Sequence, residues 1–160
     1  MAKCLLVHPI VRAQDRPRHI PYGIAQLAAV IKDKHQVAIS DMNIARELYS
    51  TEDDIFEYEL TESLKAEKWD IVGVGGLSSQ YAQIKRIIPI ARRTNPKALI
   101  VGGGGWSTYL PSEMLQLNPE LDIICVGESE ETLKEILDGG ALKDIRGIYY
   151  REDGQTIATE

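Results

Sequence analysis

Short apolar runs alternate with longer amphipathic segments along almost the whole sequence. Runs such as CLLV, DIVGVG and DIICV are continuous, which is typical of strands that are buried on both faces of a parallel sheet. The segments between them carry apolar residues at helical spacing, as Ile24, Leu27 and Ile31 do. Five rounds of strand followed by helix predict a mainly parallel sheet with helices on both faces.

The boundaries of these elements follow from the apolar runs and from residues that favour helix starts. Pro21 and Pro111 suit the first turn of a helix. Thr51 and Ser129 suit the capping position just before one. Pro89 interrupts the helical pattern that follows the third strand, which predicts a kink or a late first turn there. We expect strands at residues 3–8, 36–40, 70–75, 98–101 and 121–126.

The last residues of the chain predict a β-hairpin. Asp153-Gly154 is a strong turn signal between two strand-like segments, residues 148–150 and 156–158. We predict a flavodoxin-like (Rossmann-like) doubly wound α/β fold, with a five-stranded parallel sheet in the order 2-1-3-4-5. Residues 1–145 would form this domain, and the hairpin at residues 146–160 would extend one sheet edge and lead to a downstream domain that this sequence lacks.

Composition and charge exclude several classes of function. The formal net charge is −6 and the basic residues are scattered, whereas nucleic-acid binding needs a concentrated basic surface. No apolar run approaches the roughly 20 residues that span a bilayer, and no signal peptide is visible. We therefore expect a cytoplasmic protein that binds neither nucleic acid nor a membrane.

The two cysteines, Cys4 and Cys125, both lie within apolar runs. We interpret them as buried thiols that pack as small hydrophobic side chains. The sequence has no CxxC pair and no CxxxCxxC run, so this chain alone cannot hold an iron–sulfur cluster in the usual way.

Four consecutive glycines follow the fourth expected strand. In an open doubly wound sheet, ligands bind beyond the carboxyl ends of the strands. A glycine there is costly unless the backbone needs a positive φ or a ligand must come close. A tight turn explains one or two such residues, and we interpret the run as a ligand contact. The residues are Gly102, Gly103, Gly104 and Gly105.

A second segment of similar character follows the third expected strand, and it consists of Gly75, Gly76, Leu77, Ser78 and Ser79. Free amides at the next helix start, together with the serine hydroxyls, could hold a phosphate or an amide-rich ligand. The alternative is that Ser79 only caps its helix. There is no GxGxxG after the first strand and no GxxxxGK[ST], which disfavours nucleotide binding by these routes.

No catalytic constellation is visible in the sequence. His8 and His19 fall near the proposed edge, and we interpret His19 as a solvated loop residue. Glu128, Glu130 and Glu131 stand near the start of the last helix, where the helix dipole favours acidic side chains. We predict no catalytic residues and no metal ligands, and we expect a domain that binds a ligand.

The chain resembles the N-terminal cobalamin (B12)-binding domain of B12-dependent radical SAM proteins in these successive segments: LLVHP, IPYGIAQLAAVIKDKHQVAISDMN, DIVGVGGLSSQY, ALIVGGGG, LPSEML and VGESEETL. The closing IRGIYYREDGQTI resembles the hairpin that leads out of that domain. The similarity runs along nearly the whole chain, and the order and spacing of the motifs make it fairly specific.

The sequence also departs from the wider pattern of cobalamin-binding domains. Those domains carry a DxHxxG loop after the first strand, an SxL after the third and a GG after the fourth. Leu77 matches the Leu, and Gly102 and Gly103 match the GG, but Gly75 stands where the Ser would be. DxHxxG does not occur, so the histidine that would take the lower cobalt position is missing. That position could hold water, another side chain or nothing.

The resemblance implies how cobalamin would bind. The dimethylbenzimidazole tail would run down between the first and third strands, and the corrin ring would lie across the strand ends. Gly75, Leu77 and Ser78 would line the tail. Residues 102–105 would admit the nucleotide loop, and Ser107 with Thr108 would lie nearer the ring. The expected cofactor-binding residues are Gly75, Gly76, Leu77, Ser78, Ser79, Gly102, Gly103, Gly104, Gly105 and Ser107.

The resemblance also implies a longer parent enzyme. Radical chemistry in this family uses a 4Fe-4S cluster and S-adenosylmethionine in a following radical SAM domain, so this chain would hold the corrinoid and would have no activity alone. The parent would be a methyltransferase, or a ring-forming enzyme similar to the anaerobic magnesium-protoporphyrin monomethyl ester cyclase.

Two alternatives stay open. The first is a cofactor-free interaction or regulatory module of the same fold. The second is a flavin or nucleotide binder, which would need a hydroxyl-rich phosphate loop after the first strand. At that place the sequence reads HPIVRAQDRPRH and has neither glycine nor serine.

Overall fold

The computed structural model describes residues 1–11 and 20–159. Within them the strands are β1 (Lys3–His8), β2 (Gln36–Asp41), β3 (Ile71–Gly75), β4 (Leu99–Gly103), β5 (Ile123–Cys125), β6 (Ile148–Glu152) and β7 (Gln155–Ala158). The α-helices are α1 (Tyr22–Ile31), α2 (Met42–Ala45), α3 (Glu52–Asp54), α4 (Thr61–Lys65), α5 (Tyr81–Thr94), α6 (Pro111–Leu117) and α7 (Glu130–Leu137). A π-helix, η1 (Ile55–Leu60), and two 3-10 helices, η2 (Ser78–Gln80) and η3 (Leu142–Asp144), complete the elements.

The strands form one sheet in the order β2-β1-β3-β4-β5-β6-β7. Strands β1 to β5 pair in parallel, and β6 and β7 add an antiparallel hairpin to the β5 edge. The predicted fold class and strand order are therefore confirmed. The hairpin turn is formed by Asp153 and Gly154, with φ of 48° and 77°, as the tight turn of a two-residue hairpin requires.

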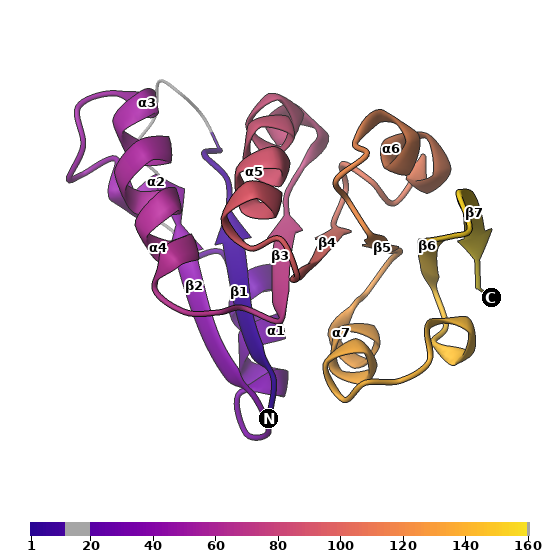
Figure 1. The fold of residues 1–160 in the computed structure, drawn as a ribbon. Coiled ribbons are helices and arrows are strands. Elements are labelled where there is room, and N and C mark those ends of the chain that lie inside the picture. Colours follow the sequence, from indigo (N-terminus) through magenta and orange to yellow (C-terminus); the bar gives the residue numbers. More distant parts are fainter. Residues whose placement is uncertain (12–19, 160) are drawn as a thin grey trace.

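Helices cover both faces of the sheet. Figure 1 shows α5 and α6 on one side of the sheet and α1 and α7 on the other. Alternate residues of each strand point to opposite faces, so Leu5 and Val7 belong to one apolar cluster, and Cys4 and Leu6 to the other. This double burial explains why the strand sequences are continuous apolar runs. We refer to the two sides as the α5/α6 face and the α1/α7 face.

The segment between β2 and β3 is helical from residue 52 to residue 65. Thr51 caps it as predicted, because its hydroxyl accepts a hydrogen bond from the backbone N–H of Asp54 at 3.1 Å. Its inner residues are buried on the α5/α6 face, and they are Ile55, Phe56, Leu60 and Leu64.

Several boundaries differ from the sequence-based expectation, and most of the differences are one or two residues. Strand β4 runs on to Gly103, because Gly102 and Gly103 pair with Val74 and Gly75 of β3. Strand β5 is only three residues long. Helix α5 begins at Tyr81 and contains Pro89, so the expected late start is wrong. The proline removes one backbone donor, and the rest of this long helix outweighs that loss.

The start of α7 also differs. Ser129 precedes the helix, but its hydroxyl donates to the Gly127 carbonyl at 3.2 Å and does not cap the helix. The predicted side-chain cap is therefore wrong. Gly139 follows the helix with a φ of 82°, a left-handed conformation that commonly ends helices.

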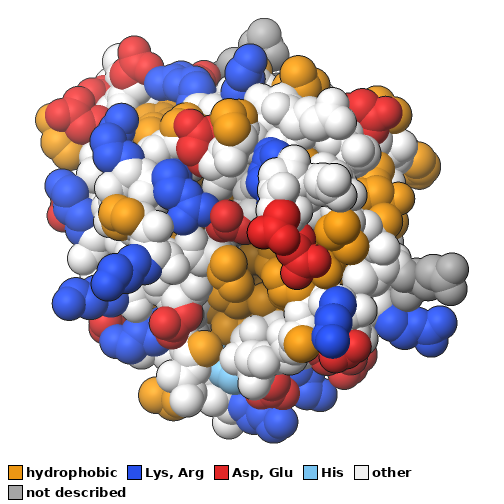
Figure 2. All heavy atoms as spheres, turned by 45° about the vertical axis from the view of Figure 1, so that its right-hand side comes forward, with side chains coloured by type: hydrophobic (Ala, Val, Ile, Leu, Met, Phe, Trp, Pro, Cys, Tyr) orange, Lys and Arg blue, Asp and Glu red, His pale blue; other side chains and the backbone are white. Residues whose placement is uncertain are grey.

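Charged side chains of both signs are interspersed on the face that Figure 2 shows, and apolar side chains gather in a hollow near its middle. Among residues 1–11 and 20–159, no helix is long and apolar enough to cross a membrane.

Candidate functional site: a pocket between the sheet and helices α1 and α7

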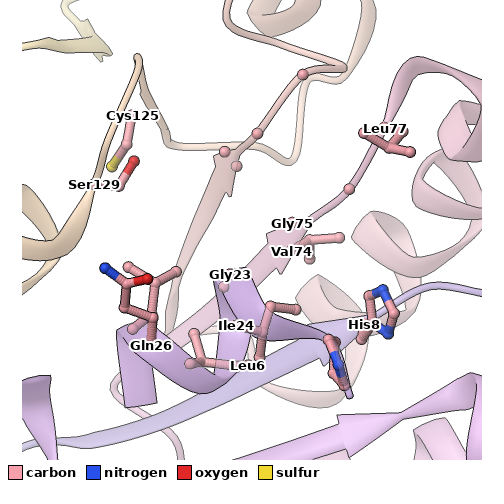
Figure 3. A pocket seen from close by; sticks show the side chains of 18 of the residues that line it. Leu6, His8, Gly23, Ile24, Gln26, Val74, Gly75, Leu77, Cys125 and Ser129 are labelled. Carbon is pink, nitrogen blue, oxygen red and sulfur yellow. The ribbon is translucent and has the colours of Figure 1, made fainter. Parts of the chain in front are cut away.

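A pocket of about 650 Å³ lies on the α1/α7 face of the sheet, near the carboxyl ends of the strands. Figure 3 shows Leu6 and Ile24 on one side of it, and Cys125 and Ser129 on the other. Helix α1 contributes one wall and α7 the other, while the strands supply the base. The pocket therefore lies at the edge where an open doubly wound sheet binds ligands.

The strand residues of the pocket form two rows across the sheet. In the lower row, Leu6 pairs with Gly73 and Gly73 pairs with Val101. Two residues further along the strands, Gly75 pairs with Gly103 in the upper row. The upper row is thus without side chains at its centre, directly below the mouth of the pocket.

Some of the glycines in this region are explained by the packing of the protein itself. A Cβ at Gly73 would lie 2.8 Å from Leu6 Cδ2, and a Cβ at Gly102 would lie 2.8 Å from Trp106 Cζ2. Gly104 has a φ of 91°, and its Cβ would lie 2.7 Å from the Gly76 carbonyl oxygen. These residues are glycine because neighbouring protein atoms already fill the space.

The other glycines have no such internal reason. A Cβ at Gly75 would meet nothing closer than Ile24 at 3.8 Å, and a Cβ at Gly103 nothing closer than 3.9 Å. At Gly105 the nearest atom would be Leu77 Cδ2 at 3.8 Å. These positions keep space open, which fits a bulky group that approaches the backbone closely.

The lower part of the pocket is apolar. Leu6 and Val101 form its base, Ile24 and Leu27 of α1 form one wall, and Leu133 of α7 forms the other. An apolar space of this kind suits the flat, uncharged part of a ligand.

Cys125 and Ser129 add weakly polar groups on the β5 side. Burial raises the pKa of the Cys125 thiol to about 12, so the thiol is neutral near pH 7. Cys4 is buried on the same face with its pKa raised to about 12 for the same reason. Both cysteines are therefore buried free thiols, as predicted.

The loop after β3 is held by Gln80, which sequence reasoning missed. Its Oε1 accepts a hydrogen bond from the Leu77 backbone N–H at 2.8 Å, and its Nε2 donates to the Pro9 carbonyl at 2.8 Å. Gln80 is 1% exposed, so both polar ends of its amide are satisfied inside the protein. Gly76 and Leu77 thereby lie at the pocket.

The three predicted serines are not among the residues that line the pocket. Ser78 donates to the Gly105 carbonyl at 3.2 Å and Ser107 to the Gly104 carbonyl at 3.4 Å. Ser79 lies within η2 and does not cap the following helix, whose N-cap position is occupied by Gln80 without a side-chain cap hydrogen bond. Ser78 and Ser107 therefore brace the glycine loops, and a cofactor contact at the three serines stays a prediction. All other predicted residues line the pocket, namely Gly75, Gly76, Leu77, Gly102, Gly103, Gly104 and Gly105.

A polar group at the ends of β1 and β2 was also missed. His8 lines the pocket, and its Nδ1 lies 3.2 Å from Asp41 Oδ1 and 3.0 Å from Asn43 Nδ2. Burial raises the pKa of Asp41, but hydrogen bonds from His8 and Asn43 more than offset this, so the pKa lies below its ordinary value of 3.8. The His8 ring is thus held by an ionised carboxylate. The other edge histidine, His19, lies outside the described residues.

Exposed apolar side chains surround the mouth of the pocket. Ile20 is 62% exposed, Tyr22 77%, Leu77 58% and Tyr109 85%. We call these four residues the apolar rim. Large exposed apolar groups gathered around a pocket mark a surface that is covered when a ligand or partner binds. Within residues 1–11 and 20–159, no three His, Cys, Asp or Glu side chains are grouped so that they could hold a metal ion.

Comparison with known proteins supports this interpretation of the site. The family model described as B12 binding domain matches residues 9–137. An uncharacterized methyltransferase, PH0819, of Pyrococcus horikoshii is 30% identical over 139 residues, which cover 84% of this chain and 28% of that protein. The anaerobic magnesium-protoporphyrin IX monomethyl ester cyclase of Rubrivivax gelatinosus is 29% identical over 114 residues, which cover 66% of this chain and 20% of the cyclase.

The chain thus spans less than a third of the length of these relatives. Among solved structures, a pilus assembly-related protein from Burkholderia pseudomallei matches 90% of this chain and 95% of its own, with a TM-score of 0.51 and 16% identity. That likeness concerns the fold alone. The family match covers most of the chain and includes β3, β4, β5, α1 and α7, which contribute residues to the pocket. The chain therefore belongs to the B12-binding domain family.

Proposed function

We propose that the pocket receives the nucleotide tail of cobalamin and that the corrin ring lies across the apolar rim at the strand ends. The observation that carries this proposal is the pair Gly75 and Gly103, which leaves the upper row open although no protein atom needs the space. A flavin or nucleotide phosphate would instead need a phosphate-binding loop after β1, and the sequence there is HPIVRAQDRPRH.

The residues of the chain bind and orient the cofactor. The two glycine loops hold each other: Ser78 donates to the Gly105 carbonyl, and the Trp106 backbone N–H donates to the Gly76 carbonyl at 3.4 Å. Ile24 and Leu133 exclude water from the tail. Bound cobalamin supplies a cobalt centre that can carry a methyl group or take part in radical chemistry.

The parent enzyme that we propose is a B12-dependent radical SAM methyltransferase or cyclase of the cytoplasm. Its relatives are larger proteins named as a methyltransferase and as cyclases. The two cysteines of this chain are buried thiols, and the sequence contains no CxxxCxxC motif. The 4Fe-4S cluster and S-adenosylmethionine would therefore be held by a further domain.

Titration of the purified chain with hydroxocobalamin tests the binding proposal. We expect a change in the visible spectrum that saturates near one equivalent. Gly103→Val should weaken binding at least about tenfold, because its methyl groups enter the space of the tail. Ala158→Val adds the same groups to an exposed residue of β7 and should bind like the wild type.

Circular dichroism checks that the chain and both variants are folded. If the folded wild-type chain gives no spectral change across the micromolar range, cobalamin binding is contradicted and a cofactor-free module is favoured. A parallel titration in which a flavin forms a complex with the chain would favour the flavin or nucleotide alternative. The coding sequence after residue 160 tests the proposed parent enzyme separately. We expect a CxxxCxxC motif there. Its absence from the whole protein would overturn the radical SAM assignment.

A further inference from the structure

We infer that the pocket selects among cobamides by the base that ends their nucleotide tail, and that it favours an apolar benzimidazole over a purine. Cobamides share the corrin ring and differ in this base. The inference rests on the proposed function, since it assumes that the tail enters the pocket with its base foremost.

The deep end of the pocket presents carbon atoms. Leu6 lies over Gly73, with its Cδ2 2.8 Å from the place where a Cβ of Gly73 would be. Val101 continues this lower row on β4, and Leu27 and Leu133 close it from the two helices. A base that reaches this depth meets side chains that can neither donate nor accept a hydrogen bond.

The polar groups of the pocket lie nearer to its mouth. The Cys125 carbonyl and the Ser129 hydroxyl face Gly103, each 3.9 Å from the place of its absent Cβ. Gly103 is two residues beyond Val101, which is about 6.6 Å further along a strand. These groups therefore stand at the level where the sugar and phosphate of the tail would pass.

Two further polar side chains near the pocket, those of Gln80 and His8, make hydrogen bonds within the protein. Both ends of the Gln80 amide are bonded to backbone groups, and His8 is held by Asp41 and Asn43. The Cys125 thiol is neutral and a weak donor at best. The residues of the lower row, Leu6, Gly73 and Val101, offer no side-chain hydrogen-bonding group to a base.

A purine such as adenine carries an amino donor and ring acceptors where dimethylbenzimidazole carries methyl groups. Buried against Leu6, Val101 and Leu133, these groups would lose water without gaining a partner. An apolar pocket rejects an added polar group of similar size by up to about a hundredfold. We therefore expect between about tenfold and a hundredfold weaker binding of an adenine-bearing cobamide.

The test measures dissociation constants of the whole chain for three ligands: cobalamin, the corresponding cobamide with adenine as its base, and cobinamide, which has no nucleotide tail. The expected order is cobalamin tightest and the other two weaker. Val101→Thr places a hydroxyl of nearly equal size in the base of the pocket and should narrow the ratio between cobalamin and the adenine form. Val37→Thr makes the same change on β2, outside the pocket, and should leave the ratio unchanged.

Each contrary result has a distinct meaning. Equal affinity for cobalamin and the adenine form overturns the selectivity, while the proposed function stands. Cobinamide binding as tightly as cobalamin overturns both the selectivity and the placement of the tail. Failure of all three ligands to bind overturns the proposed function itself. Leu133→Gln, which offers an amide to the purine from α7, gives a second measurement of the ratio if Val101→Thr is unstable.

Discussion

Neighbouring residues of β4 face two differently built halves of the molecule. On the α5/α6 face, Gly102 is covered by the Trp106 ring, which stacks on Tyr81 with ring centroids 5.8 Å apart. On the α1/α7 face, the next residue, Gly103, borders an open pocket. One glycine is needed because the space is full, and the other because the space is kept free. The same residue type therefore serves folding on one face and binding on the other.

The largest effect should come from truncating matched leucines on the two faces. Leu115 of α6 is fully buried on the closed face, and Leu133 of α7 is 3% exposed beside the pocket. Leu115→Ala should lower the free energy of unfolding by about 3 kcal/mol, because it leaves a new cavity. Leu133→Ala should cost about 2 kcal/mol, since it enlarges a space that already exists. Urea denaturation measures the free energy of unfolding of both variants. Equal losses would contradict the difference between the packed α5/α6 face and the α1/α7 face with its pocket.

Alanine at the two adjacent glycines should sharpen the comparison. Gly102→Ala places a Cβ 2.8 Å from Trp106 and should cost about 2 kcal/mol of unfolding free energy through overpacking. Gly103→Ala should leave stability unchanged or raise it by up to about 0.5 kcal/mol, because alanine restricts the unfolded chain. Cobalamin affinity should fall for Gly103→Ala. A stable Gly102→Ala protein would show that the indole gives way.

The contacts of Asp41 with His8 and Asn43 should affect how the stability of the protein depends on pH. The pKa of Asp41 is lowered in the folded protein, so its contribution is present above the unfolded value and is lost as pH falls through the folded one. Asp41→Asn should lower the free energy of unfolding by about 1 kcal/mol at pH 7. The difference from the wild type should shrink below the ordinary value of 3.8. A difference that persists unchanged at pH 3 would exclude the ionised carboxylate as its source.

The smallest effect concerns the two thiols. The pKa of each is raised to about 12, so only about one molecule in ten thousand carries either thiolate at pH 8. Both should react slowly with a thiol reagent. Cobalamin should slow the residual reaction of Cys125, which lines the pocket, and leave that of Cys4 unchanged. Mass spectrometry of the labelled peptides separates the two, and equal protection would place the ligand elsewhere.

Much of the fold could be predicted because the apolar runs and turn residues carry local information. The strand order and the Asp153-Gly154 hairpin are examples. The opposite roles of Gly102 and Gly103 could not be predicted from the sequence, because they depend on the register between β4 and β3. The pairing of His8 with Asp41 likewise needs β1 and β2 to be adjacent in space.

The serines teach a similar lesson about the candidate site. A hydroxyl near a glycine-rich strand end suggests a ligand contact, yet Ser107 is fully buried and bonds to the Gly104 carbonyl. The direction of a side chain within a turn follows from the turn geometry, and residue type alone does not determine it.

The cross-braced glycine loops have a thermodynamic consequence for binding. Gln80 ties the loop after β3 to the Pro9 carbonyl, and Ser78 ties it to the Gly105 carbonyl after β4. These loops are already ordered, so a ligand that enters between them loses little affinity to backbone ordering. The heat-capacity change on binding should then report the apolar area that is buried, without the larger contribution of a segment that folds around its ligand.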